Sequence, residues 1–388
     1  MTEAIPPTQA IPPTPTPGHA QQRSLDATRT YPCGSCGGEL EFDIRQQKLA
    51  CPHCGNVQEL VESVGRTVTK RDLRATIAQL KTPERAEAQA QLVAGEKEVV
   101  CAACGGHTTF TGTLTSTRCP YCATPIQRDD VHQAPARLAV DGVLPFLVDD
   151  ATAKAKLGEW VSSRWFAPNE FKTYNRTGSF TTVYASYFSY DAQADTSYTG
   201  ERGEDYTVEV GSGDNKRTET RTRWYSASGQ VHDTFEGLTV LANEGFERDH
   251  VTALEPWPLE QVKAFSHEYI AGHLSRTYDH DVEESFVEAE QRMGAIIDNT
   301  IHRDIGGDKQ RVHSKNTVFS DLVYAHLLLP IWLLTVIYDG KPFQVTINGV
   351  TGEVHGQRPY SRVKIAIAAA LAVAVIILVV VLVQAQGS

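Results

Sequence analysis

The sequence predicts an α+β protein: two small four-cysteine zinc ribbons joined by a helical spacer, a mixed α/β domain with antiparallel strands, and one C-terminal transmembrane helix. Three observations predict this fold class. All eight cysteines fall in C-x2-C pairs in the first third of the chain, the middle alternates between helical and strand periodicity, and residues 365–383 are uniformly apolar. A chain of 388 residues is long enough for two or three domains.

Residues 1–30 are rich in proline and threonine, and Ile5 to Pro17 reads IPPTQAIPPTPTP. Such a segment has little apolar surface to bury, so we expect a disordered tail. It has neither the apolar core nor the basic start of a signal peptide, which predicts that the bulk of the chain stays in the cytoplasm.

The cysteines form two sets that share the spacing C-x2-C-x14-C-x2-C at a distance of 68 positions: Cys33, Cys36, Cys51, Cys54 and Cys101, Cys104, Cys119, Cys122. The similarity extends to the glycines and aromatic residues around them, which indicates an internal duplication. We therefore expect a first zinc ribbon over 31–60 and a second over 99–130.

Two facing C-x2-C turns supply the four soft ligands that Zn²⁺ takes in a tetrahedron. Gly37, Gly55 and Gly105 stand where a positive φ lets backbone N–H groups face the thiolates, whereas Ala123 departs from this pattern. Because protein fills all four ligand positions, we expect two structural zinc ions. The alternatives are disulfides and redox-active cysteine pairs. The absence of an export signal disfavours disulfides, and the repetition of the motif at a fixed distance disfavours redox-active pairs.

A helical spacer is expected over 61–98. Asp72 can cap a turn that carries Leu73, and Thr82-Pro83-Glu84 is a second helix start that runs to Gly95. The spacer is predicted to form a helical hairpin between the ribbons.

An α+β domain is expected over 138–357. A helix should follow Asp149 and Asp150, and Tyr-, Val- and Thr-rich runs from Thr181 to Trp224 predict antiparallel strands with turns at Gly200, Gly203 and Gly211. Helical periodicity returns over two segments, Leu259 to Arg276 and Val282 to Ile305.

Strands are expected to close this domain. The apolar run from Leu327 to Tyr338 would rise only about 18 Å as a helix, so a buried strand is preferred over a membrane span. Asn348-Gly349 and Thr351-Gly352 predict tight turns of the next hairpin.

Residues 365–383 carry no charge and would cover about 28 Å as a helix, close to the hydrocarbon thickness of a bilayer. Arg358, Arg362 and Lys364 precede this run. The positive-inside rule then predicts a single-pass, tail-anchored protein of the bacterial inner membrane with its large N-terminal part in the cytoplasm.

No catalytic or cofactor-binding residue is predicted. His267 and His273 lie six residues apart, which rotates them by about 240° on a helix and breaks the metalloprotease pattern. The sequence contains no P-loop, G-x-S-x-G or dinucleotide fingerprint, so nothing points to an ATPase, helicase or hydrolase. A solvated acidic surface, rather than a metal cluster, is expected at Glu283, Glu284, Glu288 and Glu290.

Several motifs resemble a family of bacterial tandem zinc-ribbon membrane proteins of the TFIIB type, often labelled primosomal helicase-like. They are YPCGSCGG at 31–38, WVSSRWFAPN at 160–169, SYTGERG at 197–203, DIGGDKQRV at 304–312, LLLPIW at 327–332 and NGVTGEVHGQRPYS at 348–361. The resemblance covers nearly everything after Thr30. It implies association with SPFH-domain or PspA-type proteins in envelope-stress responses at the inner membrane.

Three functions follow as hypotheses. The first is a membrane-anchored zinc-ribbon adaptor or scaffold that recruits partner proteins. The second is nucleic-acid binding, which the net charge of −11 and the slight excess of Asp and Glu over residues 31–130 disfavour. The third is an enzyme with an unrecognised site in residues 138–357, and no small-molecule substrate is evident.

Overall fold

A computed structural model of the chain places most of the sequence after Thr30. The structure describes residues 31–38, 40–61, 67–82, 97–100, 106–110, 116–118, 121, 125–127, 131–133, 138–164, 168, 179–211, 216–275, 278–338, 341–357 and 360–386. The predicted tail over 1–30 lies outside these residues.

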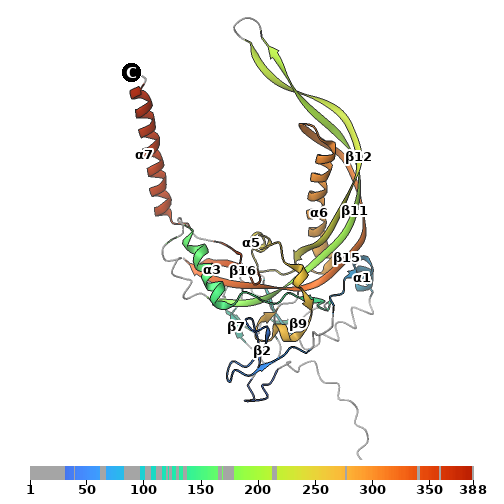
Figure 1. Ribbon diagram of the computed structural model, residues 1–388, viewed down its shortest axis with the longest axis vertical. Coiled ribbons are helices and arrows are strands. Elements are labelled where there is room, and N and C mark those ends of the chain that lie inside the picture. Colours follow the sequence, from blue (N-terminus) through green and yellow to red (C-terminus); the bar gives the residue numbers. More distant parts are fainter. Residues whose placement is uncertain are drawn as a thin grey trace, which may run out of the picture.

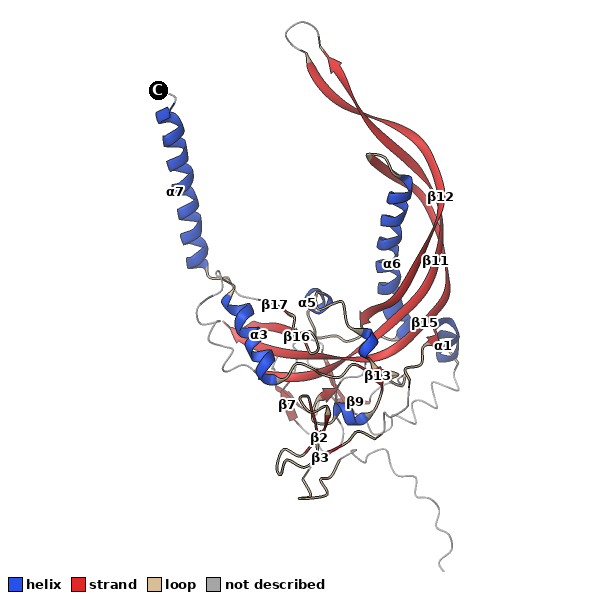
Figure 2. Cartoon of the chain, viewed as in Figure 1, coloured by secondary structure: helices blue, strands red, loops and turns tan. Residues whose placement is uncertain are grey.

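A nine-stranded sheet dominates the described chain (Figures 1 and 2). Its main path is β12 (Arg217–Leu241), β11 (Ser179–Val210), β15 (Lys309–Tyr338), β10 (Gly142–Val143) and β13 (Lys263–Ala264). Four strands pair beside this path: β4 (Arg71–Asp72), β14 (Leu274–Ser275), β16 (Lys341–Asn348) and β17 (Val354–Gly356). Neighbours are antiparallel except for β10 with β15 and β11 with β14. The three long strands run from the body of the molecule into a curved arm.

The long strands bend together at one level. The pairing of β11 with both neighbours shifts register around Asp191, which is the signature of a β-bulge. At the same level β12 contains Gly237 at φ 67°, whose N–H donates to the Asp191 carboxylate over 2.8 Å. β15 contains Asp321 at φ 48°. Irregular residues in all three strands therefore curl the sheet at this level.

Helix α6 (Val282–Ile305) lies along the inner side of the curve (Figure 1). Asp281 caps its first turn in a capping box with Glu284, and Gly306 at φ 65° ends it. Its buried residues recur every three or four positions and pack on β11, β12 and β15: Val282, Ser285, Ala289, Met293, Ile297, Ile301 and Ile305. This stripe fixes the helix to the arm.

The N-terminal part contains smaller sheets. β1 (Glu41–Asp43), β2 (Lys48–Ala50) and β3 (Val57–Gln58) form one, and β6 (His107–Phe110), β5 (Lys97–Val100) and β9 (Val131–Gln133) form another. β7 (Ser116–Arg118) and β8 (Pro125–Gln127) form a two-stranded hairpin. Only the backbone of the second and third sheets is described.

Several predicted elements are present. α1 (Leu73–Leu80) begins at its cap Asp72, and α3 (Asp150–Ser162) begins at its cap Asp149. The run Leu327–Tyr338 forms the C-terminal end of β15, and those of its side chains that the structure describes are buried. Asn348 turns the chain into β17 by accepting hydrogen bonds from the N–H groups of Val350 and Thr351. The second helix of the spacer lies outside the described residues.

The predicted fold class is contradicted. The described chain is mainly one curled antiparallel sheet, with one four-cysteine cluster rather than two ribbons. Gly200 and Gly203 lie inside the continuous strand β11 rather than in turns. The predicted helix from Leu259 to Arg276 is wrong: its described part, 259–275, is a winding segment with short 3-10 turns, η4 (Leu259–Gln261) and η5 (His267–Ile270). The second cysteine set lies outside the described residues.

The predicted membrane span over 365–383 is contradicted as well. These residues belong to α7 (Arg362–Gln386), which stands apart from the sheet in Figure 2. Within the described part of the chain, no helix combines the length and the apolar character that a membrane crossing requires. The predicted tail-anchored topology and inner-membrane location depend on this span, so they are wrong as well.

Candidate metal centre

Two backbone turns of the same shape carry the first cysteine set. In one, the Cys33 N–H donates to the Gly38 carbonyl over 2.6 Å and the Gly37 N–H donates to the Cys33 carbonyl over 2.9 Å. In the other, Cys51 pairs with Asn56 over 2.8 Å and Gly55 donates back to Cys51 over 2.9 Å. Gly37 and Gly55 both have φ 73°, which only glycine adopts without strain. The C-x2-C spacing therefore folds into two matching knuckles.

The four sulfurs converge between these knuckles. Cys33 Sγ lies 3.6 Å from Cys54 Sγ, Cys36 Sγ lies 3.6 Å from Cys51 Sγ, and all four lie within 4.8 Å of one another. A tetrahedron of sulfurs at the Zn–S bond length of about 2.3 Å has edges of about 3.8 Å. The cluster could hold a metal ion, and its dimensions match those of a zinc site.

Backbone donors favour the charged form of one sulfur in each turn. The N–H groups of Ser35 and Cys36 lower the pKa of the Cys33 thiol to about 6. In the second turn, the N–H groups of Cys54 and His53 lower the pKa of Cys51. Each knuckle thus supplies a stabilised thiolate, which is the form that binds metal.

Cys54 behaves differently. The Asn56 N–H lowers its pKa, but hydrogen bonds with the sulfurs of Cys36 and Cys33 outweigh this and raise it to about 12. Four thiolates at this distance repel one another unless a cation lies between them. A divalent metal removes the conflict, so the charge arrangement and the geometry point to the same ligand.

The fold leaves room for the cluster at Gly38. A Cβ atom at this position would lie 2.8 Å from the His53 ring and 3.5 and 3.6 Å from the sulfurs of Cys36 and Cys51. Asn56 Nδ2 approaches Cys33 Sγ at 3.7 Å as a weak outer donor. Cys33 and Cys51 are buried, whereas Cys36 and Cys54 are exposed. The cluster therefore lies at the surface, with two of its cysteines in the core and two facing solvent.

The knuckles dock on the main body through their strands. The Phe42 N–H donates to the Ala271 carbonyl over 3.0 Å, and its ring meets the Tyr269 ring edge-on at 5.4 Å. The Val61 N–H donates to both carboxylate oxygens of Glu268 at 3.1 Å. Leu49 is buried in the same core cluster as the two inner cysteines. The cysteine cluster and the body therefore share one core.

His273 joins the ribbon to the sheet. Its Nε2 lies 3.2 Å from the Phe42 carbonyl, and its Nδ1 lies 2.8 Å from the Thr182 hydroxyl. Because a carbonyl only accepts, Nε2 carries the proton and Nδ1 accepts from Thr182. Burial lowers the pKa of this imidazole. The sequence placed His273 on a helix, whereas it follows η5 and acts as a structural bridge.

His273 should make stability depend on pH. The folded protein holds this imidazole neutral, while the unfolded chain takes up a proton near pH 6.5, so stability is lost as the pH falls below about 6.5 towards the lowered pKa. We expect wild type to lose more thermal stability than His273→Gln between about pH 7.5 and pH 5.5. Metal loss in acid affects both proteins, so parallel losses in the two melting series would contradict this role.

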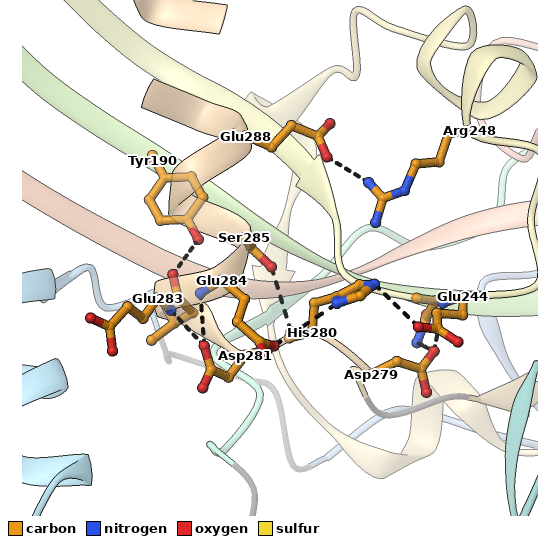
Figure 3. Close-up of polar contacts among 12 residues, drawn as sticks. Tyr190, Glu244, Arg248, Asp279, His280, Asp281, Glu283, Glu284, Ser285 and Glu288 are labelled. Atoms are coloured by element: carbon orange, nitrogen blue, oxygen red, sulfur yellow. Dashed lines mark hydrogen bonds and ion pairs between the residues drawn. The ribbon is translucent and has the colours of Figure 1, made fainter. Parts of the chain in front are cut away.

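The predicted acidic surface on α6 takes part in caps and ion pairs (Figure 3). Glu284 accepts from the Asp281 N–H over 3.0 Å, and Glu288 accepts from Arg248 over 2.6 Å. Glu283 accepts from Lys81 over 2.8 Å, and Glu290 is exposed. Glu284 therefore caps its own helix, and Glu283 and Glu288 bind cations on neighbouring segments.

His280 lies between carboxylates in the same region. Figure 3 shows it beside Glu244 and Glu284, with ring nitrogens 3.6 and 3.9 Å from their oxygens. Asp279 receives the Glu244 N–H over 2.6 Å. This group braces the start of α6 against the loop after β12.

A cavity of about 1120 Å³ lies between β12 and the winding segment after Glu255. Its wall contains the ion pair of Glu255 and Arg292, and Arg292 also donates to the Thr239 carbonyl over 2.6 Å. Trp257 and Tyr269 contribute aromatic surface. No histidine or cysteine occurs among its described lining residues.

The second cysteine set, Cys101, Cys104, Cys119 and Cys122, lies outside the described residues. The described strands around it fit the duplication, because β7 ends directly before Cys119 as β2 ends directly before Cys51. Tyr121 lies within this set and is fully buried. Through this buried side chain, Tyr121 attaches to the core of the body.

Comparison with known proteins gives one informative result. The chain is similar to the uncharacterized protein YdjG of Bacillus subtilis (strain 168). The two are 26% identical over 338 residues, which cover 87% of this chain and 92% of YdjG. No model of a protein family matches the chain, and no solved structure matches it. This similarity extends over most of both chains, and the name of that relative assigns no zinc ribbon, metal, partner or activity.

Proposed function

We propose that this protein is a zinc-dependent adaptor, in which a four-thiolate ribbon presents a rigid surface to partner proteins. The observation that carries the proposal is the closed sulfur cluster, whose ligands all come from the protein and leave no position for water or substrate. Cys36 and Cys54 reach the surface, so the metal holds exposed loops in fixed positions. A closed site of this kind supports structure and recognition rather than catalysis.

The arm supports the same proposal. β11 and β12 stay paired from Tyr187 to Val210, but β15 begins only opposite Gly203, so the outer hairpin is two-stranded (Figure 1). An isolated two-stranded hairpin is marginally stable in water. Tyr206 is 39% exposed on it, and Tyr225 is 44% exposed at its base, opposite Arg202. A projecting hairpin with exposed aromatic rings is suited to contacts with another protein.

The family resemblance suggests SPFH-domain or PspA-type proteins as partners, in envelope-stress responses. Nucleic acid is a weaker candidate, because the net charge of −11 opposes phosphate binding.

Metal analysis tests the first part of the proposal. We expect the purified full-length protein to contain zinc, with at least one ion per chain for the described cluster. A second ion would belong to the second cysteine set. Protein with neither zinc nor another divalent metal, purified without chelator, would refute zinc dependence.

Co-purification tests the adaptor role. A tagged full-length chain from native cells should retain an SPFH-domain or PspA-type protein, and Cys36→Ser/Cys54→Ser should lose it. Ser35→Ala changes an exposed side chain of the same knuckle without removing a ligand, so it should retain both metal and partner. Equal recovery with the metal-free variant would exclude the ribbon as the docking surface, and salt-dependent retention on DNA would favour the nucleic-acid hypothesis.

A further inference from the structure

A separate cavity of about 640 Å³ lies where four elements meet, far along the sheet from the arm. α3 and β16 form two of its walls, and β17 and α5 (Arg248–Thr252) complete it. Its volume falls within the range of pockets that bind small molecules. The site belongs neither to the cysteine cluster nor to the larger cavity.

Cationic and imidazole side chains gather in this cavity. Arg164 and Lys341 are basic side chains, and His250 and His355 add two imidazoles. Among the described lining residues none is a carboxylate. In a chain with a net charge of −11, such a concentration of basic groups creates a local site for an anion.

Arg164 has an unused donor. Its Nε is buried and has no hydrogen-bond partner among the described residues. A buried N–H without an acceptor costs free energy, and arginine is the side chain best shaped to bind phosphate or carboxylate oxygens. An anion in the cavity would meet the Arg164 side chain, which is part of its lining.

Aromatic side chains line the same cavity. The Arg164 guanidinium lies 5.2 Å from the centroid of the Trp160 ring, which fixes both groups. Trp160 and Phe343 are half-buried and pack against the core, and Tyr360 is exposed at the rim. Such rings offer flat surfaces on which a planar ligand can stack.

We propose that this cavity binds a nucleotide, with its phosphates on Arg164 and Lys341 and its base against the aromatic wall. The two recognition elements lie in one pocket of suitable size, and each matches one half of a nucleotide. None of the described lining residues of this cavity is a cysteine of the first set.

Titration calorimetry on the metal-loaded full-length chain tests this proposal with ATP, adenosine and tripolyphosphate as probes. We expect ATP to bind, with an affinity that falls as salt is raised, and the other two to bind at least about tenfold more weakly. Tripolyphosphate binding as tightly as ATP would show that the cavity reads charge alone. Adenosine binding as tightly, or no ATP binding at millimolar concentration, would also overturn the proposal.

Variants locate the site. Arg164→Met should weaken ATP binding at least about tenfold, and Phe343→Leu should weaken ATP and adenosine alike. Lys154→Met removes a cation from the exposed side of α3, where it pairs with Asp150 at 2.7 Å outside the cavity, and should bind as wild type. Thermal melting confirms that each variant is folded. Wild-type affinity in Arg164→Met, or an equal loss in Lys154→Met, would refute the assignment.

Discussion

Replacing both buried cysteines, Cys33→Ser/Cys51→Ser, is expected to abolish metal binding by the first cysteine set and to unfold the first ribbon. These two sulfurs carry the stabilised thiolates and are 3% and 2% exposed. Structural zinc contributes about 10–16 kcal/mol of apparent folding free energy in small zinc domains. Most domains have a total stability of about 5–15 kcal/mol, so this loss exceeds what the ribbon can tolerate.

The consequences should reach the body. Leu40, Phe42 and Leu49 belong to the core cluster that also contains Trp332 of β15, so an unfolded ribbon exposes apolar surface of the sheet. We expect a lower melting temperature together with the loss of metal in elemental analysis. His53→Ala removes an exposed side chain next to the cluster and should keep the metal. A double variant that contains as many metal ions per chain as wild type and melts as wild type would show that the cluster is not a metal site.

The cluster could be predicted because its geometry is local. A C-x2-C turn with a following glycine closes over five or six residues, so spacing alone indicates the knuckles and the sulfurs. The helices α1, α3 and α6 were predictable for the same reason. Asp72, Asp149 and Asp281 cap their first turns through hydrogen bonds to residues two or three positions away.

The curled sheet was not predictable, because it depends on residues far apart in sequence. Gly200 and Gly203 look like turn residues, yet they serve close approach between strands: a Cβ at Gly203 would lie 2.8 Å from Thr222. The segment after Leu259 shows helical periodicity in its sequence. Its backbone is nevertheless irregular, and its apolar residues line a cavity. Apolar character over 365–383 predicted a membrane span that the described helix does not support. Composition and periodicity describe a segment by itself, so they cannot predict which residues a strand distant in sequence will contact.

Gly200→Ala should be the most damaging single change in the arm. A Cβ atom at this position would collide with the carbonyl oxygen of Arg311 in β15 and lie 3.2 Å from the Ile305 side chain at the end of α6. Gly200 also stands at a register shift between β11 and β15. Because the obstacle is backbone, relief requires the strands to separate, at a cost of about 1–3 kcal/mol or more.

Gly294→Ala provides the matched control. Gly294 lies in the interior of α6, and a Cβ there would meet nothing within 4 Å. Alanine is favoured over glycine in a helix by about 1 kcal/mol, so this variant should be more stable than wild type in denaturant melts. Replacing glycine with alanine would then lower stability at a position in β11 and raise it at a position in α6. If Gly200→Ala were neutral, β11 and β15 could not approach as closely as described, and glycine would be present at this position for its flexibility alone.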